Sequence, residues 1–308
     1  MSLRAANGRI VYKTRLRREE SALQPKSLLN PFLSASNFLM RTLAILFLTI
    51  AAFGQTATET GKQALPVDQE NARKARAIVD RGIQALGAQA YLNVKDLSEE
   101  GKNFNFHMGR PVGAGTIYWR FYKLPDKERV EFTKQRDVVD LFTADRAYEI
   151  TFRGVREPAA ADRMSGMLGP TWPDYFRRRR YSLDWVLRRW LNEPGIALFY
   201  EGQSVADGKS VDQVSLMNTK NESVTLFFDL ETHLPIKKSY SWRDPTDKQR
   251  NTEEEIYANY READGVMTPF TLTRFYNGDM SGQRFITSLK YNQGIDNALF
   301  DPKPLSKK

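Results

Sequence analysis

The sequence predicts a mainly β protein built on one large antiparallel sheet, with one helix before the sheet and a helical segment inserted in mid-chain. Three observations predict this fold. From about residue 97, apolar and polar residues alternate with a period of two over most of the chain. Turn-forming residues interrupt the alternation at short intervals. Two segments, 66–87 and 183–191, instead repeat their apolar residues every three or four positions, as helices do.

The segment 40–54 has the layout of a secretory signal peptide. A positive head of two residues precedes an apolar run of eleven residues, and small residues stand just before Gln55. Such a run is shorter than the roughly 20 residues that cross a bilayer. We expect cleavage near Gly54/Gln55 and a mature protein in the periplasm. The alternative for this segment is a short buried helix.

This interpretation divides the chain into three parts. Residues 1–39 become a disordered or misassigned upstream segment, and residues 55–308 become a single mature domain. Residues 1–54 hold eight of the 46 basic and two of the 37 acidic residues, so without them the formal net charge falls from +9 to +3. The high charge is therefore partly a property of the leader, and it gives little support to nucleic-acid binding.

The first helix is expected over 66–87. Pro66 and Asp68 are typical of a helix start, and Gly87 suits the C-terminal cap. The strands that follow alternate apolar and polar residues, as in 117–122, 130–133, 236–243, 270–273 and 285–291. One apolar and one mostly polar face favour an antiparallel sheet, and the short spacing of turns favours a meander of about ten strands. An open twisted sheet of that size tends to curl.

A long insertion at 153–195 interrupts the meander. Its first part, 153–171, is rich in Gly, Pro and Ala and is expected to be a loop. Ser182 then caps a short helix with an apolar stripe. Between them stand four arginines flanked by aromatic residues, which indicate either an exposed polar turn or a contact with an anionic lipid or partner surface; they are Arg177, Arg178, Arg179 and Arg180.

Several chemistries find no support in the sequence. There is no cysteine, which excludes disulfides, thiolate metal sites and a lipid-modified cysteine. The two histidines, His107 and His233, have no paired spacing for a zinc site or a hydrolase triad. The segment 202–210 has one residue too many for a phosphate-binding loop and leads into a strand. We therefore expect no catalytic residues, no metal and no cofactor.

Three segments of the last third resemble a known family. They are FFDLETHLPIKKSY (227–240), NYREADGVMTPFTLTRFYNG (259–278) and YNQGIDNALFDPKP (291–304). Together with the helix that ends in ALGAQAYLNVKDL, they resemble the periplasmic outer-membrane lipoprotein carriers, the LolA/LolB-like half-barrels. The resemblance covers most of residues 66–304, and its motifs are turn-forming and structural.

The resemblance implies a curved antiparallel sheet of about eleven strands, closed on one side by helices, whose apolar concave face holds acyl chains. The ligand-binding residues that it implies are Ile117, Trp119, Phe121, Phe132, Leu226, Phe228, Phe270, Leu272 and Phe285. The helical lid that it implies uses Leu183, Val186, Leu187, Trp190 and Leu191.

Two functions are therefore open. The first is a carrier for a lipid or acylated protein, which acts as a monomer and contacts the envelope membrane or a receptor transiently. The second is a non-carrier module on the same fold, which binds a partner or senses envelope stress and has its cavity plugged by its own helices. An enzyme is not expected, because no catalytic constellation is visible.

Overall fold

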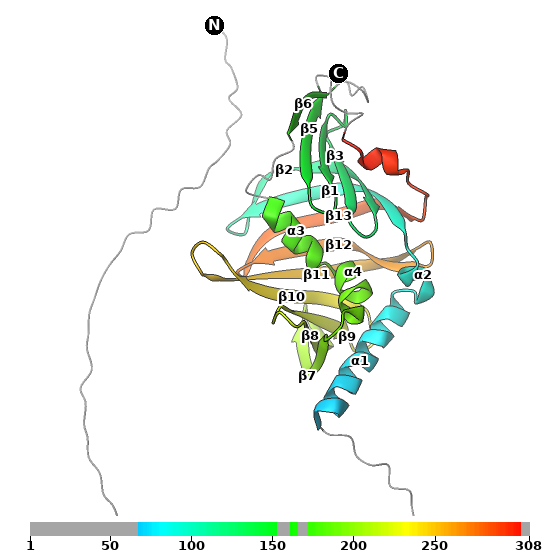
Figure 1. Ribbon diagram of the computed structural model, residues 1–308, viewed down its shortest axis with the longest axis vertical. Coiled ribbons are helices and arrows are strands. Elements are labelled where there is room, and N and C mark those ends of the chain that lie inside the picture. Colours follow the sequence, from blue (N-terminus) through cyan, green and yellow to red (C-terminus); the bar gives the residue numbers. More distant parts are fainter. Residues whose placement is uncertain (1–66, 153–160, 166–171, 303–308) are drawn as a thin grey trace, which may run out of the picture. The chain divides into compact units, whose positions relative to one another are not determined.

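The computed structural model describes residues 67–152, 161–165 and 172–302, and these residues form one antiparallel sheet of 13 strands with helices packed on it (Figure 1). The strand order is β6-β5-β4-β3-β2-β1-β13-β12-β11-β10-β9-β8-β7. The strands are β1 (Asp96–His107), β2 (Arg110–Lys123), β3 (Lys127–Phe132), β4 (Val138–Phe142), β5 (Ala147–Phe152), β6 (Ala161–Ser165), β7 (Ala197–Ala206), β8 (Lys209–Met217), β9 (Ser223–Asp229), β10 (Pro235–Arg243), β11 (Arg250–Ala263), β12 (Val266–Tyr276) and β13 (Asp279–Tyr291).

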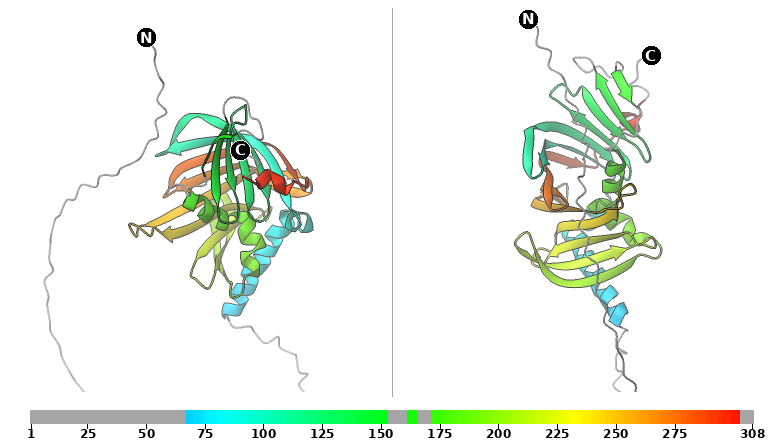
Figure 2. Two further views of the ribbon diagram at one scale, coloured as in Figure 1. Left: turned by 45° about the horizontal axis from the view of Figure 1, so that its top comes forward. Right: turned by 90° about the vertical axis from the view of Figure 1, so that its left-hand side faces the viewer.

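The sheet consists of two meanders that meet in its middle. Strands β1 to β6 follow one another on one side, β13 back to β7 follow one another on the other, and β1 pairs with β13 at the junction. The sheet is strongly twisted and curved, so that β5 and β6 run in a different direction from β12 and β13 (Figures 1 and 2). The predicted curved antiparallel fold is confirmed.

Helical elements are few and short except for the first. They are α1 (Val67–Ala85), α2 (Gln89–Leu92), α3 (Trp172–Arg180), α4 (Leu183–Arg188) and the 3₁₀ turns η1 (Trp190–Asn192) and η2 (Asn297–Phe300). Figure 2 shows α3 and α4 on the side towards which the sheet curves. None of the helices in the described part of the chain is long and apolar enough to cross a membrane.

Helix α1 forms as its apolar spacing predicts. Its buried stripe faces the sheet, and its end is set by Gly87, whose φ of 119° is a left-handed conformation. A Cβ at this position would lie 2.4 Å from the carbonyl oxygen of Gly265. A glycine is therefore required where the chain turns from the helix towards β1.

Two details differ from the sequence prediction. The structure has 13 strands where the prediction has about eleven, and one of the additional strands, β6, lies inside the segment 153–171 that is predicted as a loop. The second difference is α3. The arginine segment forms a helix, whereas one of its two sequence interpretations is an exposed polar turn. The segments predicted as an upstream region, 1–39, and as a signal peptide, 40–54, lie outside the described residues.

The principal core lies under the helices at the β7–β10 side of the sheet. Buried side chains of α1, α4 and η1 pack there on buried residues of β8, β9 and β10. A smaller core joins η2 to β4 and β5 and includes Phe121 of β2. Since Phe121 alternates with Arg120 and Tyr122, which face the helices, this smaller core lies on the other face of the sheet.

Candidate functional site

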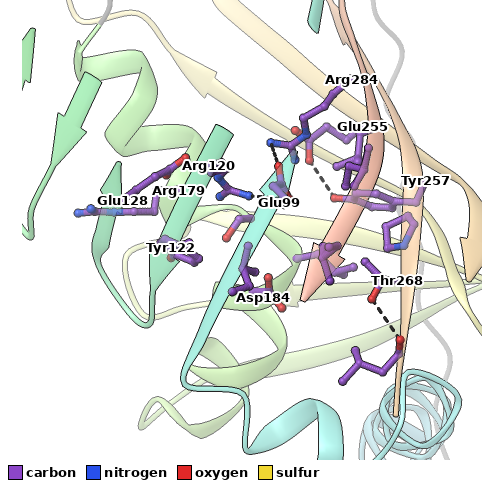
Figure 3. Close-up of a pocket in the computed structure, with 18 of the residues that line it drawn as sticks. Glu99, Arg120, Tyr122, Glu128, Arg179, Asp184, Glu255, Tyr257, Thr268 and Arg284 are labelled. Atoms are coloured by element: carbon purple, nitrogen blue, oxygen red, sulfur yellow. Dashed lines mark hydrogen bonds and ion pairs between the residues drawn. The ribbon is translucent and has the colours of Figure 1, made fainter. Parts of the chain in front are cut away.

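A cavity of about 320 Å³ lies between the inserted helices and the concave face of the sheet. Strands β1, β2, β11, β12 and β13 form most of its wall, and α3 and α4 contribute residues from the other side (Figure 3). Its volume is at the lower end of the range of about 300–1,000 Å³ that is usual for small-molecule sites. The two ends of the cavity differ in chemistry.

The apolar end lies where α1 and α2 meet the sheet. The backbone N–H of Met267 in β12 donates to the carbonyl of Leu86, just after α1, at 3.0 Å. Leu97 of β1 is the register partner of Tyr291 in β13, and the Tyr291 and Thr268 hydroxyls are 2.9 Å apart. All five residues line the cavity, so hydrocarbon entering here meets mainly apolar and aromatic surface.

The charged end is organised around Glu99 of β1. Figure 3 shows Glu99 between Arg120 and Arg284, whose terminal nitrogens lie 3.4 Å from its two carboxylate oxygens. The Tyr118 hydroxyl also donates to Glu99, at 3.1 Å. Arg120 in turn reaches Glu128 of β3, with 2.6 Å between Nε and Oε1.

A second ion cluster stands beside it on β11. Glu255 accepts from Lys238 Nζ at 2.9 Å, from the Arg274 guanidinium at 3.1 Å and from the Tyr257 hydroxyl at 2.9 Å. The Lys238 side chain is only 1% exposed. These partners matter because an unpaired charge in such a buried place costs several kcal/mol.

The partners keep the buried carboxylates ionised. Burial alone would raise the pKa of Glu128, but the charge and hydrogen bond of Arg120 outweigh it and hold that pKa below its usual value. Burial likewise opposes the ionisation of Glu255, and Lys238 and Arg274 lower its pKa well below the usual range. The charged end is therefore a set of matched ion pairs.

A second cavity of about 460 Å³ adjoins the first on the other side of α4. It lies between α4 and the turn that joins β2 to β3. Tyr122 and Asp184 line both cavities, and Figure 3 shows these two side chains beside each other at the edge of the first cavity. The second cavity thus lies directly behind the wall of the first.

Of the nine residues that the sequence predicts for the apolar ligand-binding face, only Leu272 lines the cavity. Two others, Leu226 and Phe228, are buried in the principal core below α1 and α4. Phe121 belongs to the smaller core on the other face of the sheet. The remaining five do not line the cavity; they are Ile117, Trp119, Phe132, Phe270 and Phe285.

The predicted lid residues lie on α4 and η1, at the concave face. Leu183 lines the cavity. The other four are buried in the principal core, with Trp190 fully inaccessible; they are Val186, Leu187, Trp190 and Leu191. Most of this segment therefore fills the concave face beside the cavity, and one residue faces the cavity itself.

The arginines of α3 contact other parts of the protein. Arg178 Nε lies 2.9 Å from Glu253, and an Arg180 terminal nitrogen lies 2.6 Å from Glu222. Both side chains keep about a third of their surface exposed, 32% and 35% respectively. Their predicted contact with an external anion stays a prediction.

The two other arginines of this segment make different contacts. Arg179 lines the cavity and donates to three backbone carbonyls at 2.6–2.9 Å, among them that of Thr143. The Arg177 guanidinium lies 3.8 Å from the ring centre of Trp242. Helix α3 is thus fixed to both meanders of the sheet by its basic residues.

Sequence reasoning misses most of the cavity wall, which consists of charged and tyrosine side chains on β1, β2 and β11. The alternation of apolar and polar residues predicts that the charged positions of these strands face solvent. Among them are Glu99, Arg120 and Glu255. One available indication is the position of a charged residue between two tyrosines in Tyr118-Arg120-Tyr122, since a strand face with two large rings is seldom fully exposed. Within the described residues, no group of three or more His, Cys, Asp and Glu side chains is placed to hold a metal ion.

No family model matches the sequence, and no curated protein matches it. Among solved structures, a DUF1329 family protein from Desulfovibrio piger superposes with a TM-score of 0.50 at 13% identity, over 77% of this chain and 99% of its own. A domain named for outer membrane lipoprotein sorting, from Vibrio parahaemolyticus, gives 0.46 at 11% identity, over 77% and 99% of the two chains. A LolA superfamily protein from Nitrosomonas europaea gives 0.44 at 11% identity, over 74% and 97%.

These likenesses concern the fold alone, because all the identities are low. The DUF1329 protein is covered almost completely, so the likeness extends over nearly the whole of that chain. The half-barrel, with helices packed on one face, has the predicted architecture. The predicted fold, a curved antiparallel sheet with helices on its concave face, is thus confirmed.

Proposed function

We propose that this protein is a periplasmic lipid- or lipoprotein-binding carrier, which holds acyl chains at the apolar end of the cavity between α4 and the concave face. The observation that carries the proposal is this cavity of about 320 Å³, with Leu86, Leu97, Met267 and Leu272 in its wall. Burial of hydrocarbon is worth about 0.8 kcal/mol per CH₂. A ligand can therefore be held without catalysis, and we propose a binding role because the glutamates of the cavity are matched in ion pairs.

The proposed function differs from the sequence prediction in the place where the acyl chain of the ligand lies. Of the nine apolar positions expected to hold acyl groups, three belong to the two cores and only Leu272 lines the cavity. The hydrocarbon would occupy the end near α1 and α2, and the charged end would bound it. The lipoprotein-sorting name of the Vibrio parahaemolyticus domain is consistent with this class of ligand.

The proposal is tested by lipid extraction and mass spectrometry of the protein purified from its natural compartment. We expect acyl lipid or an acylated peptide in near-stoichiometric amount. Leu272→Trp places an indole in the cavity and should reduce the amount recovered several-fold. Ser288→Trp, at an exposed position of β13, adds the same ring outside and should leave recovery unchanged.

A second candidate function is a binding or stress-sensing module with a plugged cavity. The observation in its favour is that Leu187 and Trp190 already fill much of the concave face, with exposures of 1% and 0%. Lipid-free protein whose melting temperature does not respond to acyl ligands, and does not change in Leu272→Trp, would favour this candidate over the carrier.

A further inference from the structure

The second cavity has a basic wall. Four cations line it, Lys95, Lys123, Arg188 and Arg189, whereas Asp184 is the single acidic residue among its described lining residues. We call these four residues the basic mouth. Arg188 is paired with Asp184, at 3.3 Å between Nε and Oδ1. The described wall of this cavity has no further carboxylate that would neutralise the positive charges of the other three residues.

The surplus charges are held in place without carboxylates. Lys123 Nζ donates to the backbone carbonyl of Ile295 at 2.7 Å. The Arg189 guanidinium lies 4.6 Å from the ring centre of Trp185. Among the described residues, neither Lys95 nor Arg189 has an ion-pair partner within 4.0 Å, and both are exposed.

The charged end of the first cavity is unlike the basic mouth. There Arg120, Arg274 and Arg284 each have a carboxylate within 3.4 Å. An anion entering that end would compete with ionised glutamates, whereas an anion at the basic mouth would meet surplus positive charge. Electrostatic complementarity therefore favours the mouth.

The rest of the second cavity's wall is mainly apolar, and it leads from the basic mouth towards the first cavity. Leu92, Val94, Leu124 and Trp185 stand among its basic residues. Tyr122 and Asp184 form the partition between the two spaces. A hydrocarbon chain in the first cavity would therefore pass close to the cations when it leaves at this side.

We propose that the ligand is an anionic amphiphile, whose phosphate or carboxylate group binds at the basic mouth while its chain lies in the first cavity. This inference rests on the proposed function and adds the charge of the ligand to it. The mouth would hold the head group by charge–charge attraction, in a place that water also reaches. The attraction should therefore weaken as salt is added.

The test is calorimetric binding of matched ligands to the mature protein. The probes are a lysophosphatidic acid and the monoacylglycerol of the same chain length, which differ by one phosphate group, together with glycerol 3-phosphate, which lacks the chain. At low salt we expect the lysophosphatidic acid to bind at least about tenfold more tightly than the monoacylglycerol. In the double variant Lys95→Glu/Arg189→Glu this ratio should fall to about one or below, while the affinity for the monoacylglycerol stays within about twofold.

The control is Lys220→Glu/Arg243→Glu, which makes the same charge change at two exposed positions outside both cavities and should keep the preference. Thermal unfolding of both variants checks that they are folded. Equal affinities for the two acylated probes would overturn this inference about the charge of the ligand, but they would not contradict the proposed carrier function. Glycerol 3-phosphate binding as tightly as the lysophosphatidic acid would overturn it in favour of a site for free phosphate esters. If no acylated probe binds, the proposed function itself fails.

Discussion

Asp140 of β4 is a residue whose ionisation opposes folding. It lies opposite Glu149 of β5, and Glu128 of β3 is near. Burial, together with the charges of Glu149 and Glu128, raises the pKa of Asp140 from 3.8 to about 7. Between these pH values the folded protein binds more protons than the unfolded chain. Stability from this group is therefore present below about pH 4 and is lost as the pH rises towards 7.

We expect Asp140→Asn to stabilise the protein at pH 8 by about 1–3 kcal/mol and to change little at pH 4, since a pKa difference of one unit corresponds to about 1.4 kcal/mol. Urea unfolding at several pH values measures this. Glu149→Gln should give part of the same gain, because it removes one of the two neighbouring charges. A variant whose stability runs parallel to that of the native protein from pH 4 to 8 would show that Asp140 titrates normally.

At the scale of the element, α1 is held to the sheet through Gly82. A Cβ at this position would lie 2.3 Å from Cε1 of Phe228, and Phe228 is only 2% exposed. The helix and β9 therefore approach as closely as they do because residue 82 has no side chain. Sequence reasoning sees this glycine as one position of an apolar stripe and not as a contact point.

Gly82→Ala should lower the free energy of unfolding by about 1–3 kcal/mol, as overpacking of a dense core does. Helix propensity alone would predict a gain of about 1 kcal/mol, so the sign of the change separates the two effects. Gln84→Ala, at an exposed position of the same helix, should change stability by less than about 0.5 kcal/mol. Chemical denaturation of the native protein and of the two variants measures these changes. A stabilised Gly82→Ala protein would contradict the close packing.

Helix α4 has two kinds of apolar residue, one for the cavity and one for the core. Leu183 lines the cavity, and Leu187 is buried to 1% exposure. Leu187→Ala should cost about 2–5 kcal/mol of stability, whereas Leu183→Ala should cost clearly less and should weaken acyl-ligand binding several-fold. Parallel unfolding and binding titrations test both. Equal stability losses with unchanged binding would show that Leu183 is a core residue like its neighbour.

The strand pattern predicts this sheet but not which face of it meets the helices. In β2, Trp119 and Phe121 alternate with Arg120 and Tyr122, and the more polar set lines the cavity. Both faces of the sheet carry packed side chains, so an apolar residue does not by itself identify the concave face. The pairing of Arg120 with Glu99 depends on the register of β1 with β2, and that of Arg284 on the junction of two meanders. Neither is visible in a local window of the sequence.

At the scale of the whole sheet, the concave face has a filled side and a hollow side. On the filled side, α1, α4 and η1 pack on β8, β9 and β10, where Val214, Leu216 and Leu226 are fully buried. On the hollow side, β1, β12 and β13 border the cavity. We expect the filled side to keep the fold together while the hollow side exchanges its contents, because most buried strand residues of the principal core lie on β8, β9 and β10.

This division predicts two classes of amide hydrogen exchange. Amides of β8 and β9 should exchange slowest, since they open only with the main core, and an acyl ligand should leave their rates unchanged except through global stability. Amides of β12 and β13 should exchange faster in the free protein and slow by about tenfold or more on binding, because the ligand replaces the empty space behind them. Peptide-resolved exchange with mass spectrometry measures both classes at once. If ligand slows β8 and β9 as much as β12 and β13 under conditions where exchange is local, the sheet responds as one unit and the hollow side has no separate freedom to load or release a chain.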